Sequence, residues 1–458
     1  MLGTLKNKKD SLIARFTRSK AKARVKKTRK TKRSARSSGV KRALPVHLLW
    51  DNPAVLLLRD PRIGIGLLLL VLAVVSFPYI RAYTEFSPRR AEGEGTLDAS
   101  EQWDGSSRLI MLAVGEDRIS EKHRFIDALA LIVVDPERQE LGVFTIHPDI
   151  DVFVPELGRT VTLRTVLNLQ EAKGREIEAI VRAVEVLMAV KIDRYIDTDE
   201  EGFSAFAAAF EPVPVNLAYN LEDADITDSS GRVMGWSSGG DTVYQSEFVG
   251  FLSTDQFGKD SQLARQSEFF AELIAGVDSF RTAANLPALL ERFQQHVTTN
   301  LTKEEVLMLG RHVWGLRRDQ IKLGYTRASS LLMTEDGSIY DRFTPVYDSI
   351  DKDISSILYN FAMAKEQARI EVYNGSGVRG MAGSRARWLT NSGGRVVQVG
   401  NARDEEVTKI YVERPERYPL TLHEIERVFG GEVIYSDSPY ERKHIGDIIV
   451  VIGASVAD

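Results

Sequence analysis

Two apolar runs joined by a short polar turn constrain the fold of this chain more than any other feature. Residues 128–134 are almost continuously apolar, which is typical of a strand buried on both faces of a sheet. Residues 135–138 supply a turn, and residues 141–146 return as a second strand. An antiparallel pair would bring together the carboxylates at its open end, which are Asp127, Asp149 and Asp151. On spacing alone, an ordinary polar turn is favoured there over a functional site.

The N-terminal part of the chain predicts a membrane anchor. Residues 1–45 hold seventeen Lys and Arg against a single acid, so the rest of the chain carries about twenty more acids than bases. An uncharged run of eighteen residues, 63–80, follows between Arg62 and Arg81. That length is sufficient to cross a hydrocarbon core of roughly 30 Å, and no signal-peptide cleavage site follows it. The basic excess before the run predicts a cytoplasmic N-terminus, an anionic lipid partner for the tail and an exterior body.

The remaining organisation follows from composition and periodicity. We expect a basic, disordered tail (1–62), a transmembrane helix (63–80), a tether (81–107), a main domain with a helical extension (108–365) and a small terminal module (366–458). The chain has no cysteine, and its seven histidines form no zinc-binding spacing. Nucleic acid is not expected as a partner, although the basic tail alone would permit it.

Within the main domain, helical periodicity is found near residues 163–188, 203–210, 263–274 and 286–297. Thr302 and Glu305 have the spacing of a capping box that opens a further helix. Residues 220–240 are polar and rich in Gly and Asp, which favours a long loop. The terminal module is expected to contain strands and helices in the order β-α-β-β-α-β. Its GxGxxG turn at 375–380 favours close strand–helix packing over nucleotide binding, because no acid follows at the tip of the second strand.

The order of these motifs resembles the LytR–CpsA–Psr family of bacterial envelope proteins over residues 108–275. The motifs that carry the resemblance are Leu-Ala-Val-Gly115-Glu-Asp117, Asp127 before a buried strand, Phe-Thr-Ile-His-Pro-Asp149 and Gln262-Leu-Ala-Arg265-Gln266. The terminal module is similar to the LytR C-terminal domain. The resemblance implies an α/β fold, with a three-layer α/β/α exterior domain and a small α/β C-terminal domain after one transmembrane helix.

The family resemblance also implies a function. Its members transfer a glycopolymer from a polyprenyl-pyrophosphate carrier to peptidoglycan, with Mg²⁺ and arginines at the mouth of an apolar pocket that holds the lipid. Arginine forks and a metal on carboxylates suit phosphoryl transfer, which depends on positioning and charge stabilisation. Carried over to this chain, the expected catalytic residues are Asp127, Asp149 and Arg265, with Asp127 and Asp149 as Mg²⁺ ligands. The expected substrate-binding residues are Arg124, Lys259 and Gln266.

The chain departs from the family where arginines are expected. The Pro-Arg-Asp motif reads His147-Pro148-Asp149, the strand that should carry further arginines reads Phe251-Leu-Ser-Thr-Asp255, and Arg124 lies one residue from its expected position. Other arginines could take these places, namely Arg138, Arg159, Arg164 or Arg194. Loss of a charge-assisted contact in the transition state costs about a hundredfold in rate. The chain is therefore expected to be either a transferase of this class or a non-catalytic binding or scaffolding module for an envelope polymer or polyprenyl lipid.

Overall fold

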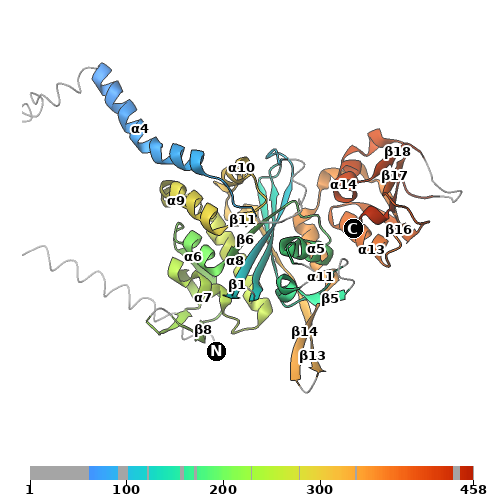
Figure 1. The fold of residues 1–458 in the computed structure, drawn as a ribbon, viewed down its shortest axis with the longest axis horizontal. Helices are drawn as coiled ribbons and strands as arrows, with labels where there is room; N and C mark the ends of the chain where they lie inside the picture. The colour runs from blue at the N-terminus through green and yellow to red at the C-terminus, as the bar shows by residue number, and fades with distance from the viewer. Residues whose placement is uncertain are drawn as a thin grey trace, which may run out of the picture. The chain divides into compact units, whose positions relative to one another are not determined.

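A central sheet built around the predicted hairpin organises the main domain (Figure 1). The computed structural model describes residues 61–90, 102–120, 123–154, 159–169, 173–227, 230–277, 279–335, 338–436 and 444–456. The chain divides into two units, Met1–Ala73 and Val74–Asp458, and the sheets belong to the second. Among the described residues the central sheet has the strand order β11-β6-β1-β2-β3-β12. Its strands are β1 (Leu109–Ser120), β2 (His123–Asp135), β3 (Glu140–Ile146), β6 (Arg194–Asp199), β11 (Thr298–Thr299) and β12 (Ile321–Tyr325).

Strand β2 is buried on both faces, as its apolar run predicts. Leu129, Leu131 and Val133 pack into one core together with α5 (Glu176–Met188) and α11 (Tyr347–Leu358). The alternate residues Ile132 and Val134 pack into a second core with α8 (Lys259–Ala275) and α10 (Lys303–Val313). This alternation follows from the two-residue period of a strand. Helices therefore cover both faces, and the predicted α/β/α layering is present.

Several helices were placed correctly by periodicity. The short helix η2 (Leu163–Asn168) precedes α5, and α6 (Glu200–Ala207), α8 and α9 (Phe280–His296) follow in the expected order. At the start of α10, the Thr302 hydroxyl accepts the Glu305 N–H at 3.2 Å and the Glu305 carboxylate accepts the Thr302 N–H at 2.8 Å. The predicted capping box is confirmed.

Two regions differ from expectation because they contain strands. Residues 220–240, expected to be a loop, contribute β8 (Leu221–Thr227), β9 (Val233–Trp236) and the start of β10 (Gly239–Val243), which pairs with β7 (Val213–Leu217). These two-stranded ribbons leave many side chains in solvent, so they lack the apolar alternation that marks a strand. After the helices expected up to residue 315, the chain contains strands that the sequence analysis did not predict: β12 and a hairpin of β13 (Ala328–Glu335) and β14 (Ser338–Pro345). A smaller ribbon pairs β4 (Asp151–Val154) with β5 (Arg159–Thr162).

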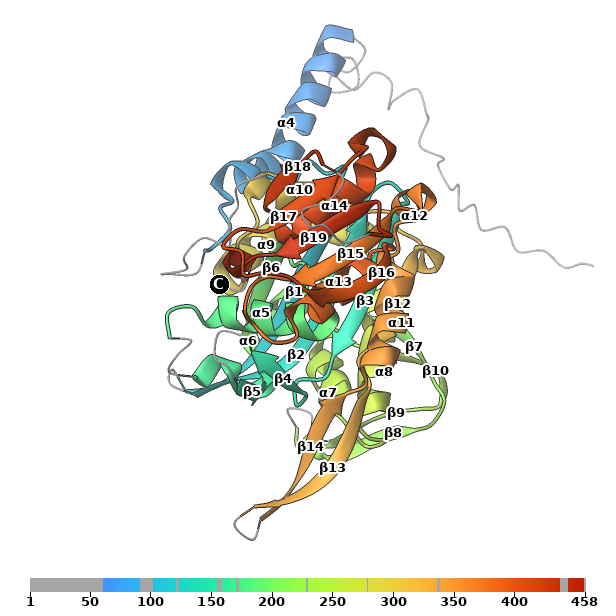
Figure 2. The same cartoon turned by 90° about the vertical axis from the view of Figure 1, so that its right-hand side faces the viewer.

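The terminal module has the predicted order of elements plus one extra short strand. After α12 (Phe361–Glu366), its sheet has the order β16-β15-β19-β17-β18 (Figure 2). The elements are β15 (Arg369–Asn374), α13 (Met381–Asn391), β16 (Arg395–Asn401), β17 (Lys409–Val412), α14 (Pro419–Phe429), β18 (Glu432–Ile434) and β19 (Ile448–Ile452). The GxGxxG turn connects β15 to α13, and a Cβ at Gly375 would lie 2.8 Å from the Arg403 carbonyl oxygen. That glycine is required by close backbone packing, as expected.

The predicted membrane span lies within helix α4 (Pro61–Glu85). Side chains before Ala73 lie outside the described residues, as do the basic tail (1–60) and residues 91–101 of the expected tether. In the part of the chain that could be searched, no helix is long and apolar enough to cross a membrane. Phe86 and Trp103, at the two ends of the expected tether, are both buried.

Candidate functional site

A β-bulge sets the position of Asp127 at the open end of the central hairpin. Gly115 pairs with Ala128 across β1 and β2, but the next residue, Glu116, pairs with Ile126. Asp127 is therefore the extra residue on β2, and a bulge of this kind redirects a side chain and bends its strand. The Asp127 side chain is 56% exposed. The carboxylate is thus presented to solvent at the end of a strand that is otherwise buried.

Asp149 lies in the turn that follows β3, and His147 shapes this turn. The His147 ring is buried and packs against the Phe343 ring, with centroids 4.6 Å apart. The ring Nδ1 accepts the Asp149 backbone N–H at 3.0 Å, and the backbone N–H of His147 donates to the Thr326 hydroxyl at 2.7 Å. Burial lowers the pKa of His147 to about 4, so the ring is neutral at pH 7 and can act as this acceptor. His147 therefore does not supply the positive charge that the family motif has at this position.

Arg164 supplies a positive charge to both acids. Its Nη1 donates to Asp127 at 3.1 Å, its Nη2 donates to Asp149 at 3.2 Å, and its Nε donates to the second oxygen of Asp149. Burial alone would raise the pKa of Asp149, but the hydrogen bond and charge of Arg164 outweigh it, so that pKa lies below its ordinary value. Arg164 comes from η2, which was predicted only as part of a helical segment. The sequence left it as one of four arginines that could move into the vacated positions.

The two other arginines from that set whose contacts are described lie elsewhere. Arg138 contacts Asp135 at the opposite end of the hairpin, and Arg194 forms a buried pair with Glu305 at 2.8 Å.

Arg124 lies on the neighbouring part of β2 and is held by a separate acid. Its Nε donates to the Glu116 carboxylate at 2.8 Å, and its Nη2 lies 3.9 Å from Asp197. The hydrogen bond with Glu116 raises the pKa of Arg124 above its ordinary value. Asn168 of η2 also bonds both the N–H and the carbonyl of Arg124, at 3.1 and 2.6 Å. Because η2 carries Arg164 as well, this short helix supplies one guanidinium group and fixes the backbone of the residue that carries the other.

Lys259 stands at the margin of the site. Its Nζ is 3.0 Å from Asp255 and 3.2 Å from the Gln262 side-chain oxygen. Its charge contributes to lowering the pKa values of His147 and Asp149, so it lies within electrostatic range of the cluster. The structure thus places Lys259 near the acids, and its expected role in substrate binding stays a prediction.

Arg265 and Gln266 face a different part of the domain. Both are buried in α8, where Arg265 Nε donates to the Phe251 carbonyl at 3.1 Å and Gln266 Nε2 donates to the Leu252 carbonyl at 3.0 Å. Arg265 also donates to the Thr254 carbonyl. These bonds satisfy carbonyls in the last turn of α7 (Phe248–Ser253), which have no partner within the helix, and the carbonyl of the residue that follows it. Within the described residues neither side chain contacts Asp127, Asp149 or Arg164, so the substrate roles expected for them would require both to leave these carbonyls.

Asp127 and Asp149 offer a limited site for a divalent cation. No group of three or more His, Asp or Glu side chains suited to a metal occurs in the described part of the chain. The two carboxylates do converge, because both bond the same guanidinium. Mg²⁺ is commonly held by one or two carboxylates together with water and substrate phosphates. The pair is therefore compatible with Mg²⁺ only when a phosphate-bearing substrate supplies further oxygens.

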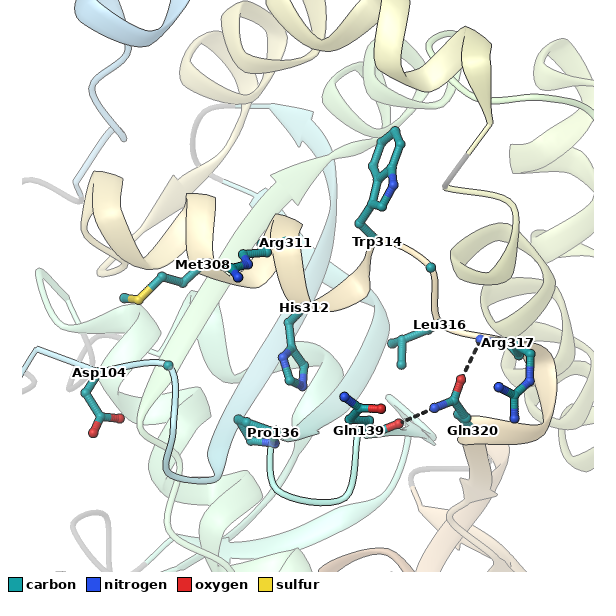
Figure 3. A pocket seen from close by; sticks show the side chains of 12 residues that line it. Asp104, Pro136, Gln139, Met308, Arg311, His312, Trp314, Leu316, Arg317 and Gln320 are labelled. Atoms are coloured by element: carbon teal, nitrogen blue, oxygen red, sulfur yellow. Dashed lines mark hydrogen bonds between the residues drawn. The ribbon is translucent and has the colours of Figure 1, made fainter.

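A hollow of about 580 Å³ lies at the other end of the sheet (Figure 3). It is formed by the end of α10 and the turn between β2 and β3, and its lining includes Arg311, His312, Gln139 and Gln320. Pro136 of that turn is nine residues from Asp127 along β2, which corresponds to about 30 Å in a strand. This polar hollow is distinct from the acid–arginine cluster and does not have the character of a lipid pocket.

The comparisons with known proteins agree with the resemblance seen in the sequence. Residues 84–344 match the model of the LytR_cpsA_psr family. The chain belongs to the LytR–CpsA–Psr family. Residues 367–455 match a second model, described as LytR cell envelope-related transcriptional attenuator. The acid–arginine cluster therefore lies in the LytR–CpsA–Psr domain, and the GxGxxG turn lies in the second domain.

Individual relatives of this LytR–CpsA–Psr protein are distant. The polyisoprenyl-teichoic acid–peptidoglycan teichoic acid transferase TagV of Bacillus subtilis (strain 168) is 23% identical over 230 residues, which span 49% of this chain and 57% of TagV. The match thus covers little more than half of that protein's length. The crystal structure of B. subtilis TagV is 18% identical with a TM-score of 0.46, covering 54% of this chain and 94% of that one. A structure of TagT bound to LIIa-WTA is 16% identical with a TM-score of 0.43, covering 58% and 95%.

Proposed function

We propose that this LytR–CpsA–Psr protein transfers a glycopolymer from a polyprenyl-pyrophosphate carrier to peptidoglycan or another envelope acceptor. The observation that supports this proposal is the bridge that Arg164 forms between Asp127 and Asp149. A guanidinium has five N–H donors, and three of those on Arg164 bond the two carboxylates. Two donors remain for oxygens of a bound pyrophosphate. In this proposal Arg164 performs the task of the arginine that the His147-Pro148-Asp149 motif lacks.

Charge balance favours a metal ion in the loaded site. Asp127 and Asp149 carry two negative charges against the single positive charge of Arg164, and His147 is neutral. A pyrophosphate is itself an anion, so its binding to this cluster requires additional positive charge. Asp127 and Asp149 would hold Mg²⁺, which would neutralise phosphate oxygens when bound. Arg124 and Lys259 lie beside the cluster as further cations, each paired with an acid in this structure.

Positioning is the protein's main contribution to such a reaction. The acceptor hydroxyl displaces polyprenyl phosphate from the phosphorus atom that carries the glycan. The bulge at Asp127 and the turn at His147 fix the two carboxylates, and Asn168 ties η2 to β2. Arg164 therefore approaches the reacting phosphates from a short helix that is anchored beside both acids.

A second function, binding of the lipid-linked polymer without turnover, is favoured by one observation. Arg265 bonds the carbonyls of Phe251 and Thr254 and is not directed at the cluster. The cluster then has one directly bonded arginine where the family resemblance implies several. Loss of one transition-state contact corresponds to about a hundredfold in rate, so substrate would bind but react slowly.

We further propose that α4 anchors the protein in the cytoplasmic membrane, with residues 74–458 outside. The span 63–80 is uncharged between Arg62 and Arg81, and the described side chains Val74, Phe77 and Ile80 are 58–66% exposed. Large apolar side chains on an isolated helix are unfavourable in water and favourable in a hydrocarbon core.

The test uses the full-length chain in lipid nanodiscs with a polyprenyl-pyrophosphate-linked oligosaccharide, Mg²⁺ and peptidoglycan. Release of polyprenyl phosphate is measured for the wild type, Arg164→Gln and the control Arg317→Gln, which removes an exposed ion pair with Asp319. Transfer predicts release by the wild type and the control, and a loss of about a hundredfold or more in Arg164→Gln. Binding alone predicts substrate affinity that depends on Arg164 with no release. Equal affinity and equal rates for wild type and Arg164→Gln would refute the role assigned to Arg164, and a wild type that neither binds the substrate nor releases polyprenyl phosphate would contradict both functions.

A further inference from the structure

The chain from Tyr79 to Arg89 runs alongside α9 in the same direction. The Tyr79 hydroxyl donates to the Ala283 carbonyl at 3.3 Å, and the rings of Phe86 and Phe293 meet edge to face at 5.9 Å. Further along, the Arg89 carbonyl accepts the Thr299 N–H at 2.8 Å. Residues 79–89 and 283–299 are therefore held together by contacts at three successive levels, the first of which joins α4 to α9.

This alignment places the N-terminal turn of α9 at the level of the predicted span. Tyr79 is the penultimate residue of the run 63–80, and it is level with Ala283. Phe280 precedes Ala283 by three residues, which corresponds to about 4.5 Å further toward the N-terminal end of α4. A bilayer that contains the span therefore has its interface at or beyond the level of Phe280.

Phe280 has the character of a residue that meets such an interface. Its side chain is 89% exposed, more than that of any other large apolar residue in the described part of the chain. It occupies the first position of α9, whose N-cap Ser279 accepts the Thr282 N–H and so fixes the orientation of this turn. Aromatic side chains are enriched at membrane interfaces, and two more lie near the end of α4, where Tyr79 contacts Ala283 of α9 and Tyr83 contacts Lys303 of α10.

We propose that Phe280 and the N-terminal turn of α9 insert into the outer interface of the lipid bilayer and seat the LytR–CpsA–Psr domain on the membrane. This inference rests on the proposed α4 anchor and adds a second, separate contact with lipid. A single helix leaves a domain free to pivot, whereas two adjoining contacts restrict its tilt.

The seat has a consequence for the acid–arginine cluster, because α9 connects the two. The carbonyl of His296, at the C-terminal end of α9, accepts the Thr198 hydroxyl at 3.2 Å. Thr298 then pairs with Asp197, which lies 3.9 Å from Arg124. The sixteen residues from Phe280 to His296 span about 24 Å along the helix axis. Helix α9 thus places its own C-terminal end, beside Thr198, no more than about 24 Å above the interface, and the edge of the site follows from there.

The experiment uses the absence of cysteine from the chain, which makes single-cysteine labelling specific. Full-length Phe280→Cys, Phe77→Cys and Leu332→Cys variants carry an environment-sensitive fluorophore in nanodiscs of phosphatidylethanolamine and phosphatidylglycerol, with or without brominated acyl chains. Leu332 is the matched control, since it is 70% exposed on the β13–β14 hairpin, and Phe77 reports the anchor. We expect a shift to shorter wavelength and bromine quenching at Phe280 and Phe77, and neither effect at Leu332.

The other outcomes overturn the inference in distinguishable ways. Quenching at Phe77 without quenching at Phe280 would leave the anchor in place and refute the seat. No quenching at Phe77 would refute the anchor, and the seat with it. Equal quenching at Phe280 and Leu332 would show non-specific contact of the whole domain with lipid and would also refute the seat.

Discussion

Replacement of His147 by Asn should remove about 3 kcal/mol of the acid sensitivity of the main domain. In the folded protein the pKa of this imidazole lies at about 4, mainly because burial disfavours the charged form, whereas its ordinary value is 6.5. Below pH 6.5 the unfolded chain binds a proton at this position and the folded chain does not, so acid favours unfolding. The loss amounts to about 3 kcal/mol of the free energy of unfolding between pH 7 and pH 4, at about 1.4 kcal/mol per pKa unit. Asn cannot titrate, and its side-chain oxygen can still accept the Asp149 N–H.

The measurement is urea-induced unfolding of the full-length chain in detergent micelles at several pH values from 7 to 4, followed by circular dichroism. His423→Asn is the matched control, because His423 is exposed on α14. The wild type and this control should lose stability in parallel as the pH falls, and His147→Asn should lose about 3 kcal/mol less. If His147→Asn and the wild type keep the same slope with pH, the neutral, buried state assigned to His147 is incorrect.

Three further changes test the packing of the site and the sheet. A double-mutant cycle of Arg164→Gln and Asp149→Asn should give a coupling of about 1.5–3 kcal/mol in urea unfolding at pH 7. The coupling should decrease at pH 3. The pKa of Asp149 in the folded protein lies below the ordinary value, so its pair with Arg164 stabilises the fold at a pH above that ordinary value, and the stabilisation is lost as Asp149 becomes protonated. Equal coupling at both pH values would count against the pair. Arg265→Met should lower the thermal midpoint of unfolding even without substrate, because two carbonyls lose their donors and the free energy of unfolding falls by about 2–3 kcal/mol. An unchanged midpoint would mean that these bonds do not stabilise the fold and that Arg265 can turn toward a substrate. Gly142→Ala should lower the free energy of unfolding, measured by calorimetry, by about 1–3 kcal/mol, because the new Cβ would lie 2.1 Å from Ile357 Cγ2. An unchanged free energy of unfolding would mean that α11 can shift to make room.

The parts of the fold that were predictable from the sequence are those in which burial imposes a period. Strand β2 alternates between two cores, helix α5 repeats its apolar residues on the face that packs into one of them, and the capping box of α10 is a local hydrogen-bond pattern. The polar ribbons β8–β9 and β13–β14 carry no such period, because solvent surrounds much of their surface. Their pairing depends on register and turn geometry, which the composition of residues 220–240 did not reveal.

The candidate site was predictable in its acids and not in its cation. Asp127 and Asp149 follow from strand topology, because the two ends of one hairpin must meet wherever the sheet lies in the molecule. The position of the Arg164 guanidinium depends on where the short helix η2 lies after the β4–β5 ribbon. The composition of the neighbouring residues does not indicate that η2 returns to the two acids. The direction of the Arg265 side chain could not be predicted either. Its sequence motif is present, but its donors are bonded to the carbonyl oxygens of Phe251 in α7 and of Thr254, which follows α7.

In the proposed site, the charge pattern is kept although the motif has changed. A guanidinium on η2 can reach the same two carboxylates that an arginine beside Asp149 would reach, since the cluster requires only a cation between them. His147 then becomes available for a structural task, and its neutral ring fixes the Asp149 backbone from a buried position where an arginine would need its own counter-charge. His147 therefore positions Asp149, and Arg164 neutralises its charge. Loss of the arginine from the motif is therefore weak evidence for loss of pyrophosphate binding, and the confinement of Arg265 is the stronger argument about turnover.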